Sequence, residues 1–247
     1  GRITIQNGFA SNGGGIYING NVTVNNCILR ENKAYNMGSA IYAEKSTIKN
    51  SRIVDNSYEG TDLRYTVFLN RCVMDSCAVK NNTCNNVSAV GDDRGSTITN
   101  CEFEGNSSTS SHRGFYLADT KISNCKFVNT SGNGSAVELS NSSVMRGCLF
   151  KGNKDMSLNL IALSYSQVLV EDCQFIDNST TSTLLSYYGK ISRCLIKGNT
   201  TASHIVHLYY SYSSISNCLI YDNVCTTSDE PIHLYDRAAM RNCTVVR

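Results

Sequence analysis

The sequence predicts an all-β solenoid: a single-stranded parallel β-helix of about ten coils with roughly 24 residues each. Two observations predict this fold. A motif of the form C-x-[apolar]-x-x-N recurs about every 24 residues along the whole 247-residue chain. The segments around each motif alternate polar and apolar residues with a period of two and are rich in Val, Ile, Phe and Thr, a pattern typical of strands.

The motif places the same kind of residue at the same position of successive coils. Its first position is occupied by Cys27, Ser51, Cys77, Cys101, Cys125, Cys148, Cys173, Cys194, Cys218 and Cys243. The residues three positions before and two positions after are apolar in all ten coils. Five positions after stands asparagine, replaced once by Thr130. We therefore expect columns of identical side chains, with asparagines that bond from coil to coil.

A further strand segment lies about ten residues before each cysteine position, for example at residues 13–18, 38–43 and 205–208. We therefore expect three short strands in each coil, joined by turns rich in Asn, Ser and Gly. Roughly 24 residues that advance about 3.3 Å each can close a three-sided circuit, above which the next coil stacks in parallel.

Twelve cysteines raise the question of disulfides. Nine of them share one column, where we expect buried free thiols that act as small apolar side chains. A bridge between successive coils is compatible with the strand spacing but would distort the stack. Cys72, Cys84 and Cys225 lie off this column and are better candidates for exposed or paired thiols. No cysteine or histidine spacing indicates zinc, and we expect no metal and no cofactor.

Composition excludes two classes of partner. The net charge is only +2, from 22 basic and 20 acidic residues, and no basic cluster stands out, so we expect no nucleic acid partner. No apolar run approaches the ~18 residues that cross a bilayer, so we expect no membrane insertion of this segment.

Two tetrapeptide patterns carry a resemblance to known repeats. Residues 14–16, 38–41 and 134–137 are similar to GG[AG]I, and Phe103–Asn106 and Phe150–Asn153 match FxxN. These patterns resemble the repeats of polymorphic outer-membrane adhesins and of bacterial surface proteins with a right-handed, pectin-lyase-like β-helix. The resemblance covers essentially the whole chain. It implies a right-handed coil, which is also the preferred crossover, and a secreted or cell-surface location.

Residues 1–247 are expected to form one β-helix domain, with Ile3–Gly8 as the tail of an earlier coil and Cys243–Arg247 inside a strand. We expect the chain to be a segment of a larger protein, or its ends to pair with another copy, because open sheet edges invite end-to-end self-association.

Alternation in the segment before each cysteine places one side chain outward between two inward apolar ones. The outward residues are Tyr17, Tyr42, Phe68, Tyr116, Glu138, Ala162, His207 and His233, with Tyr187, Tyr209 and Tyr235 at the next outward position along the strand. An aromatic stripe stepping at about 4.8 Å could stack against sugar rings. The binding candidates are Tyr17, Tyr42, Phe68, Tyr116, His207, Tyr209, His233 and Tyr235. The alternative is that the rings stack on one another and only stabilise the coils.

An enzyme is the second interpretation, because the resemblance includes carbohydrate-active enzymes. Asp92 and Asp93, with Asp119 on the following coil, form the best acidic set. Pectin-degrading hydrolases of this fold combine such a pair with Gly-His-Gly and Arg-x-Lys motifs, which this chain lacks. The pair lies in Gly91–Gly95, which suits a solvated turn. We therefore expect no catalytic residues here, with Asp92, Asp93 and Asp119 as the alternative catalytic set.

His207 and His233 share the tripeptide His-Leu-Tyr one coil apart, so their rings should lie on the same face. No third ligand is in register with them, so a surface column is the better interpretation than a metal pair. The sequence thus predicts a non-catalytic secreted or cell-surface module, structural or adhesin-like, that binds glycan or host-surface polysaccharide along an outward aromatic face. The alternative is a polysaccharide lyase or glycoside hydrolase of the pectin-lyase-like class.

Overall fold

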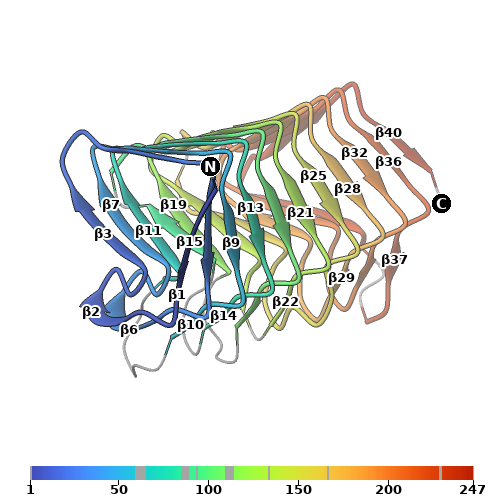
Figure 1. The fold of residues 1–247 in the computed structure, drawn as a ribbon. Coiled ribbons are helices and arrows are strands. Elements are labelled where there is room, and N and C mark those ends of the chain that lie inside the picture. The colour runs from blue at the N-terminus through green and yellow to red at the C-terminus, as the bar shows by residue number, and fades with distance from the viewer. Residues whose placement is uncertain are drawn as a thin grey trace.

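The chain winds into an elongated solenoid whose coils stack along one axis. In the computed structural model the chain advances steadily from one end of the rod, drawn in blue, to the other, drawn in red (Figure 1). The structure describes residues 2–58, 65–84, 89–92, 94–108, 114–132, 134–165, 167–227 and 230–246. Within these ranges every regular element is a strand, and strands of successive coils pair in parallel. The predicted all-β parallel solenoid is confirmed.

Two sheets contain the motif and the strand before it. The sheet that starts at the cysteine position, called the anchor sheet, consists of β1 (Ile3–Gln6), β5 (Cys27–Arg30), β9 (Arg52–Val54), β13 (Ala78–Lys80), β17 (Glu102–Glu104), β21 (Lys126–Val128), β25 (Leu149–Lys151), β28 (Gln174–Ile176), β32 (Leu195–Lys197), β36 (Leu219–Tyr221) and β40 (Thr244–Val246). The sheet before it consists of β4 (Thr23–Asn25), β8 (Thr47–Lys49), β12 (Val73–Asp75), β16 (Thr97–Thr99), β20 (Lys121–Ser123), β24 (Val144–Arg146), β27 (Leu169–Glu171), β31 (Lys190–Ser192), β35 (Ser214–Ser216) and β39 (Ala239–Arg241).

The predicted outward aromatic residues belong to a third long sheet, called the aromatic sheet. It consists of β3 (Ile16–Asn19), β7 (Ile41–Glu44), β11 (Val67–Asn70), β15 (Val90–Asp92), β19 (Phe115–Ala118), β23 (Val137–Ser140), β26 (Ile161–Leu163), β30 (Leu185–Tyr187), β34 (Val206–Tyr209) and β38 (Ile232–Tyr235).

Most coils contain a fourth strand, so the prediction of three strands was wrong in this detail. The additional strands follow the asparagine column and form two narrow sheets. These are β2 (Phe9–Asn12), β6 (Lys33–Met37), β10 (Ser57–Tyr58), β14 (Thr83–Cys84), β18 (Ser107–Ser108) and β22 (Ser131–Gly132) in one, and β29 (Ser179–Thr180), β33 (Thr200–Thr201) and β37 (Val224–Cys225) in the other. Most of these strands span only two residues and are rich in Ser and Thr, a composition that predicts a turn rather than a strand.

Phenylalanine forms the centre of the core. Phe103, Phe127, Phe150 and Phe175 stand on successive strands of the anchor sheet and are almost fully buried. Their ring centroids lie 5.0, 4.5 and 5.2 Å apart in near-parallel stacks. Phe115 on β19 packs edge-on against the first two rings at 4.9 and 5.1 Å. The core therefore ties two sheets and four coils together.

The asparagine column forms a hydrogen-bonded ladder on both sides of Thr130, as predicted. Asn153 Nδ2 donates to Asn178 Oδ1 of the next coil at 2.8 Å and to the carbonyl oxygen of Phe127 at 3.0 Å. The backbone N–H of Asn153 donates to the same Asn178 oxygen. The residue before each ladder asparagine has a left-handed backbone, for example Asp177 with φ 55° and Gly152 with φ 64°. Each amide thereby satisfies main-chain groups of its own coil and of its neighbours.

The ladder is interrupted at Thr130. Its backbone N–H still donates to Asn153 at 3.0 Å, but its buried Oγ1 has no hydrogen-bond partner. We expect Thr130→Asn to raise the free energy of unfolding by about 1–2 kcal/mol, since it adds roughly two buried hydrogen bonds. Urea denaturation measures the change. Thr180→Asn is the matched control, because Thr180 has a similarly unpaired buried hydroxyl but lies outside the ladder. Equal effects of the two substitutions would contradict the ladder explanation.

None of the twelve cysteines forms a disulfide, and those of the motif column are buried, except Cys243 in the last coil, which is half-buried. The prediction that Cys72 and Cys84 are exposed or paired was wrong, because both are buried and neither forms a disulfide. Cys72 belongs to a second inward column with Ser96, whose hydroxyl oxygen accepts from the Cys72 N–H at 3.0 Å. Cys84 lies inside β14, where burial raises the pKa of its thiol to about 11. Cys225 is free and half-buried.

Candidate functional site

The N-terminal coils carry an aromatic stack on the outer face of the aromatic sheet. Tyr17 and Tyr42 stack with ring centroids 4.8 Å apart and an interplanar angle of 10°, and Tyr42 stacks on Phe68 at 4.9 Å and 22°. Parallel pairing places these three residues in register. Each ring covers a face of its neighbour, so a ligand would meet mainly ring edges and hydroxyl groups. Tyr17, at the end of the stack, is the exposed member.

Several of the predicted outward residues are covered. Phe68 is only 4% exposed, because Tyr65 packs against it at 5.8 Å between centroids. The Tyr65 ring also lies over Gly91 of the next coil, where any β-carbon would collide with it. Tyr116 is half-buried and packs against the same cluster. Tyr65 thus fills the position where the aromatic column lacks a side chain.

The outward residues in the middle of the aromatic sheet are also buried. Glu138 and Ala162 are buried, and the Ser164 hydroxyl donates to Glu138 Oε1 at 2.8 Å. The outward aromatic stripe is therefore not continuous. It consists of one group on the N-terminal coils and another on the C-terminal coils.

Three histidines meet on the C-terminal coils. His207 and His233 are in register on β34 and β38, with ring centroids 4.6 Å apart. The ring centroid of His204 lies 4.9 Å from that of His207 and 5.1 Å from that of His233. The repeat register did not predict that His204 would join this group. His204 Nδ1 is 2.6 Å from the carbonyl oxygen of Glu230, and His233 Nδ1 is 2.7 Å from the Glu230 carboxylate. Within the described ranges, no group of three or more His, Cys, Asp or Glu side chains is arranged to hold a metal ion.

The environment of His207 disfavours its charged form. Burial, with further contributions from the neighbouring His204 and His233, lowers the pKa of His207 to about 4. Tyr209 covers the ring at 4.3 Å, and Glu230 contacts the other two histidines. His207 is therefore neutral at pH 7.

We expect the C-terminal coils to lose stability as the pH falls from about 6.5 towards 4. The unfolded chain, in which the pKa of His207 is about 6.5, binds the proton more readily than the folded chain, so the contribution of neutral His207 is complete above that pH and disappears below it. Thermal unfolding followed by circular dichroism at pH 7, 5.5 and 4.5 measures this loss. His207→Gln should reduce the slope, and an unchanged slope would assign the pH dependence to other groups.

Tyrosines gather at the turn that follows the aromatic sheet in the last four coils. We call them the tyrosine corner: Tyr165, Tyr187, Tyr188, Tyr209, Tyr210, Tyr212 and Tyr235. Five are 40 to 59% exposed, and Tyr188 and Tyr209 are half-buried. Tyr209 and Tyr235 are in register, as predicted. Tyr187 is not in register with Tyr209, because it pairs with Leu208 and turns outward through a φ of 85°.

The predicted candidates did not include Tyr165, Tyr188, Tyr210 and Tyr212. They lie in turns, where alternation gives no direction for a side chain. The signal was compositional: the run Tyr209–Ser214 reads YYSYSS, and another tyrosine pair stands at 187–188.

The alternative catalytic carboxylates differ in environment. Asp92 is fully buried and accepts hydrogen bonds from the Ser96 N–H at 2.7 Å, the Ser96 hydroxyl at 2.9 Å, the Arg94 N–H at 3.2 Å and the Thr120 hydroxyl. Asp119 is exposed in a turn and accepts from Asn141 Nδ2 at 3.0 Å. Asp93 lies outside the described residues. Asp92 is thus occupied inside the coil and does not face solvent.

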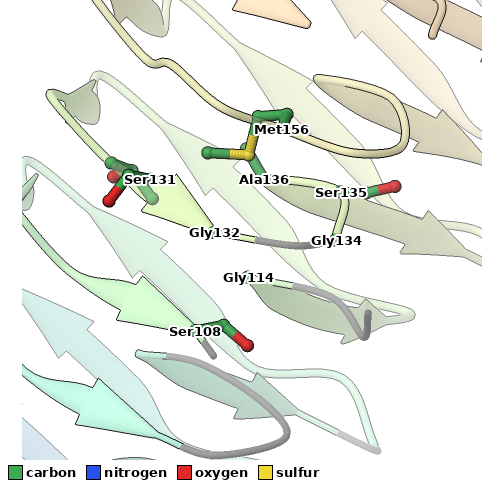
Figure 2. A pocket seen from close by; sticks show the side chains of 9 residues that line it. Ser108, Gly114, Ser131, Gly132, Gly134, Ser135, Ala136 and Met156 are labelled. Atoms are coloured by element: carbon green, nitrogen blue, oxygen red, sulfur yellow. The ribbon is translucent and has the colours of Figure 1, made fainter. Parts of the chain in front are cut away.

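A small hollow lies elsewhere, beside the narrow sheet that contains β18 and β22 (Figure 2). It encloses about 160 Å³ of empty space, part of it open to solvent, and is lined by Ser108, Gly114, Thr130, Ser131, Gly132, Gly134, Ser135, Ala136 and Met156. Figure 2 shows the Met156 side chain over one side of this glycine-lined gap. A ligand pocket usually measures about 300 Å³ or more, so this hollow does not suit a sugar ring.

The comparisons with known proteins concern the fold. A family model described as a right handed beta helix region matches residues 14–164, more than half of the chain. No curated protein sequence matches the chain. Among the described residues, no helix is long and apolar enough to span a membrane.

Three similar solved structures have low sequence identity and low structural similarity. The catalytic unit of a thermostable GH87 alpha-1,3-glucanase from Streptomyces thermodiastaticus strain HF3-3 has 11% identity and a TM-score of 0.38, with 100% of this chain and 64% of that chain covered. QnrB1, a plasmid-mediated fluoroquinolone resistance protein, has 10% identity and a TM-score of 0.36, with 87% and 91% covered. Tailspike protein 3 of bacteriophage CBA120 has 13% identity and a TM-score of 0.36, with 91% and 47% covered. The chain thus spans less than two thirds of the glucanase unit and of the tailspike.

Proposed function

Because the chain belongs to the family of the right handed beta helix region, we propose that it is a non-catalytic, adhesin-like β-helix module that binds glycan through its outward aromatic side chains. The observation that carries the proposal is the set of exposed tyrosines beside β26, β30, β34 and β38, on an otherwise regular scaffold. Exposed aromatic surface is costly in water and often marks an interaction site. A stacked solenoid supplies a rigid support for such a surface.

The burial of Asp92 favours binding over catalysis. Glycoside hydrolysis uses two carboxyl groups that both reach the substrate, and the oxygens of Asp92 are taken by Ser96, Arg94 and Thr120 within the protein. We further propose a secreted or cell-surface location, which suits a module that meets polysaccharide. Antibody labelling of intact cells of the source organism tests this location.

The test of function is a panel of neutral and acidic polysaccharides examined for both binding and cleavage. We expect retarded migration in affinity electrophoresis with at least one polysaccharide, and no release of reducing or unsaturated sugar ends. Release of such ends that is lost on Asp119→Asn would support the enzyme alternative. Absence of binding to every polysaccharide would overturn the proposal.

A further inference from the structure

Half of the 14 tyrosines of the chain lie in the tyrosine corner. The corresponding positions of earlier coils carry different residues: Glu44 at the end of β7 and Lys45 after it, Asn70 at the end of β11 and Arg71 after it, and Asp119 after β19. The cysteine and asparagine columns continue through both halves, with Ser51 and Thr130 as the exceptions. The scaffold therefore does not require tyrosine at these turns.

The rings form an ordered surface. Tyr188 stacks on Tyr210 at 5.5 Å and 17°, and Tyr210 stacks on Tyr212 at 5.6 Å and 18°. A second row is formed by Tyr187 and Tyr209, which stack at 6.3 Å and 20°, with Tyr235 edge-on to Tyr209 at 5.9 Å. Mutual packing fixes the rings before any ligand arrives, so little side-chain entropy is lost on binding.

The corner is nearly uncharged. Its turns, at residues 164–168, 187–189, 209–213 and 235–238, contain only Asp236 and Arg237 as charged residues, and these have opposite signs. The adjoining His207 is neutral at pH 7 because burial lowers its pKa. An acidic polymer would require a concentration of Lys and Arg, which these turns lack. Tyrosine combines an apolar ring with a hydroxyl that donates and accepts, which suits a ligand rich in uncharged hydroxyl groups.

We propose that the tyrosine corner is the glycan site of this module and that its ligand is a neutral polysaccharide. This inference rests on the proposed function and narrows it to four coils and one ligand class. The ring edges and hydroxyl groups of the stacked Tyr188, Tyr210 and Tyr212 contact the sugar rings, and the other hydroxyl groups of the corner and the neighbouring histidines bond the sugar hydroxyls.

The test compares three variants in affinity electrophoresis against soluble starch, laminarin and glucomannan as neutral probes and polygalacturonate as the acidic probe. The first variant is Tyr210→Asn combined with Tyr212→Ser; asparagine is chosen because residue 210 has a φ of 69°. The second is Tyr17→Ser, at the far end of the aromatic sheet. The third is Tyr35→Ser, on β6 outside that sheet, with an exposure similar to that of Tyr17. Thermal unfolding verifies that each variant folds.

We expect the wild-type protein to bind at least one neutral probe and the Tyr210/Tyr212 variant to bind it at least about tenfold more weakly, with the other two variants unchanged. Binding that is lost only on Tyr17→Ser would overturn the tyrosine corner while leaving the proposed function intact. Preference for polygalacturonate would overturn the neutral ligand class. Failure to bind any probe would overturn both this inference and the proposed function.

Discussion

Replacing Phe127 with alanine is expected to lower the free energy of unfolding by about 3–5 kcal/mol. Phe127 contacts Phe103 and Phe150 in the stack and Phe115 from the opposite sheet, so its loss leaves a cavity shared by three coils. Neighbouring coils cannot close this cavity independently, because parallel hydrogen bonds fix their spacing. Urea denaturation measures the loss.

The matched control is Phe9→Ala. Phe9 is exposed on β2 and contacts only the ring of Tyr35 edge-on among the described aromatic pairs. Its removal should change stability by roughly 0.5 kcal/mol or less. Similar losses for both substitutions would show that the stack carries no special share of the stability.

Replacing Asp92 with leucine is expected to cost at least about 3 kcal/mol, although leucine matches the residues above and below it. Asp92 is in register with Leu69 and Leu117, so the substitution fits the column. It leaves the buried N–H and hydroxyl of Ser96 and the hydroxyl of Thr120 without their acceptor. Thermal and urea unfolding measure this cost.

Asp119→Asn serves as the control, because Asp119 is exposed and bonded in a surface turn and asparagine tolerates its φ of 54°. It should cost about 1 kcal/mol or less. An Asp92 variant that keeps full stability but abolishes a sugar-cleaving activity would instead assign this carboxylate to catalysis.

The repeated columns could be predicted because the same residue type recurs at the same position. Ile48 and Phe103 are buried at the inward positions that the repeat predicts for them. Asn153 bonds to the asparagine at the same position of the next coil, as the stacking of identical residues requires. The register between strands follows directly from the repeat, since each inward residue pairs with the residue at the same repeat position of the next coil. The parallel solenoid is therefore encoded redundantly.

The candidate site could be predicted only in part, because turns do not follow the repeat. Tyr187 leaves its expected register through a left-handed backbone, and the 21-residue coil from Cys173 to Cys194 shortens that turn. The covering of Phe68 by Tyr65 depends on a glycine one coil away, at Gly91. Contacts of this kind depend on side-chain direction outside the strands, which alternation does not give.

The stacking of the coils also sets distances along the solenoid axis in steps of one coil. The Tyr17–Tyr42–Phe68 stack and the tyrosine corner lie on the same side of the solenoid, separated by the coils that contain Glu138 and Ala162. Since each coil contacts only its neighbours, insertion or deletion of one whole coil would change the distance between the two aromatic groups by about 4.8 Å and leave both intact. Evolution can thereby adjust the separation of two surface features in fixed steps, independently of their chemistry.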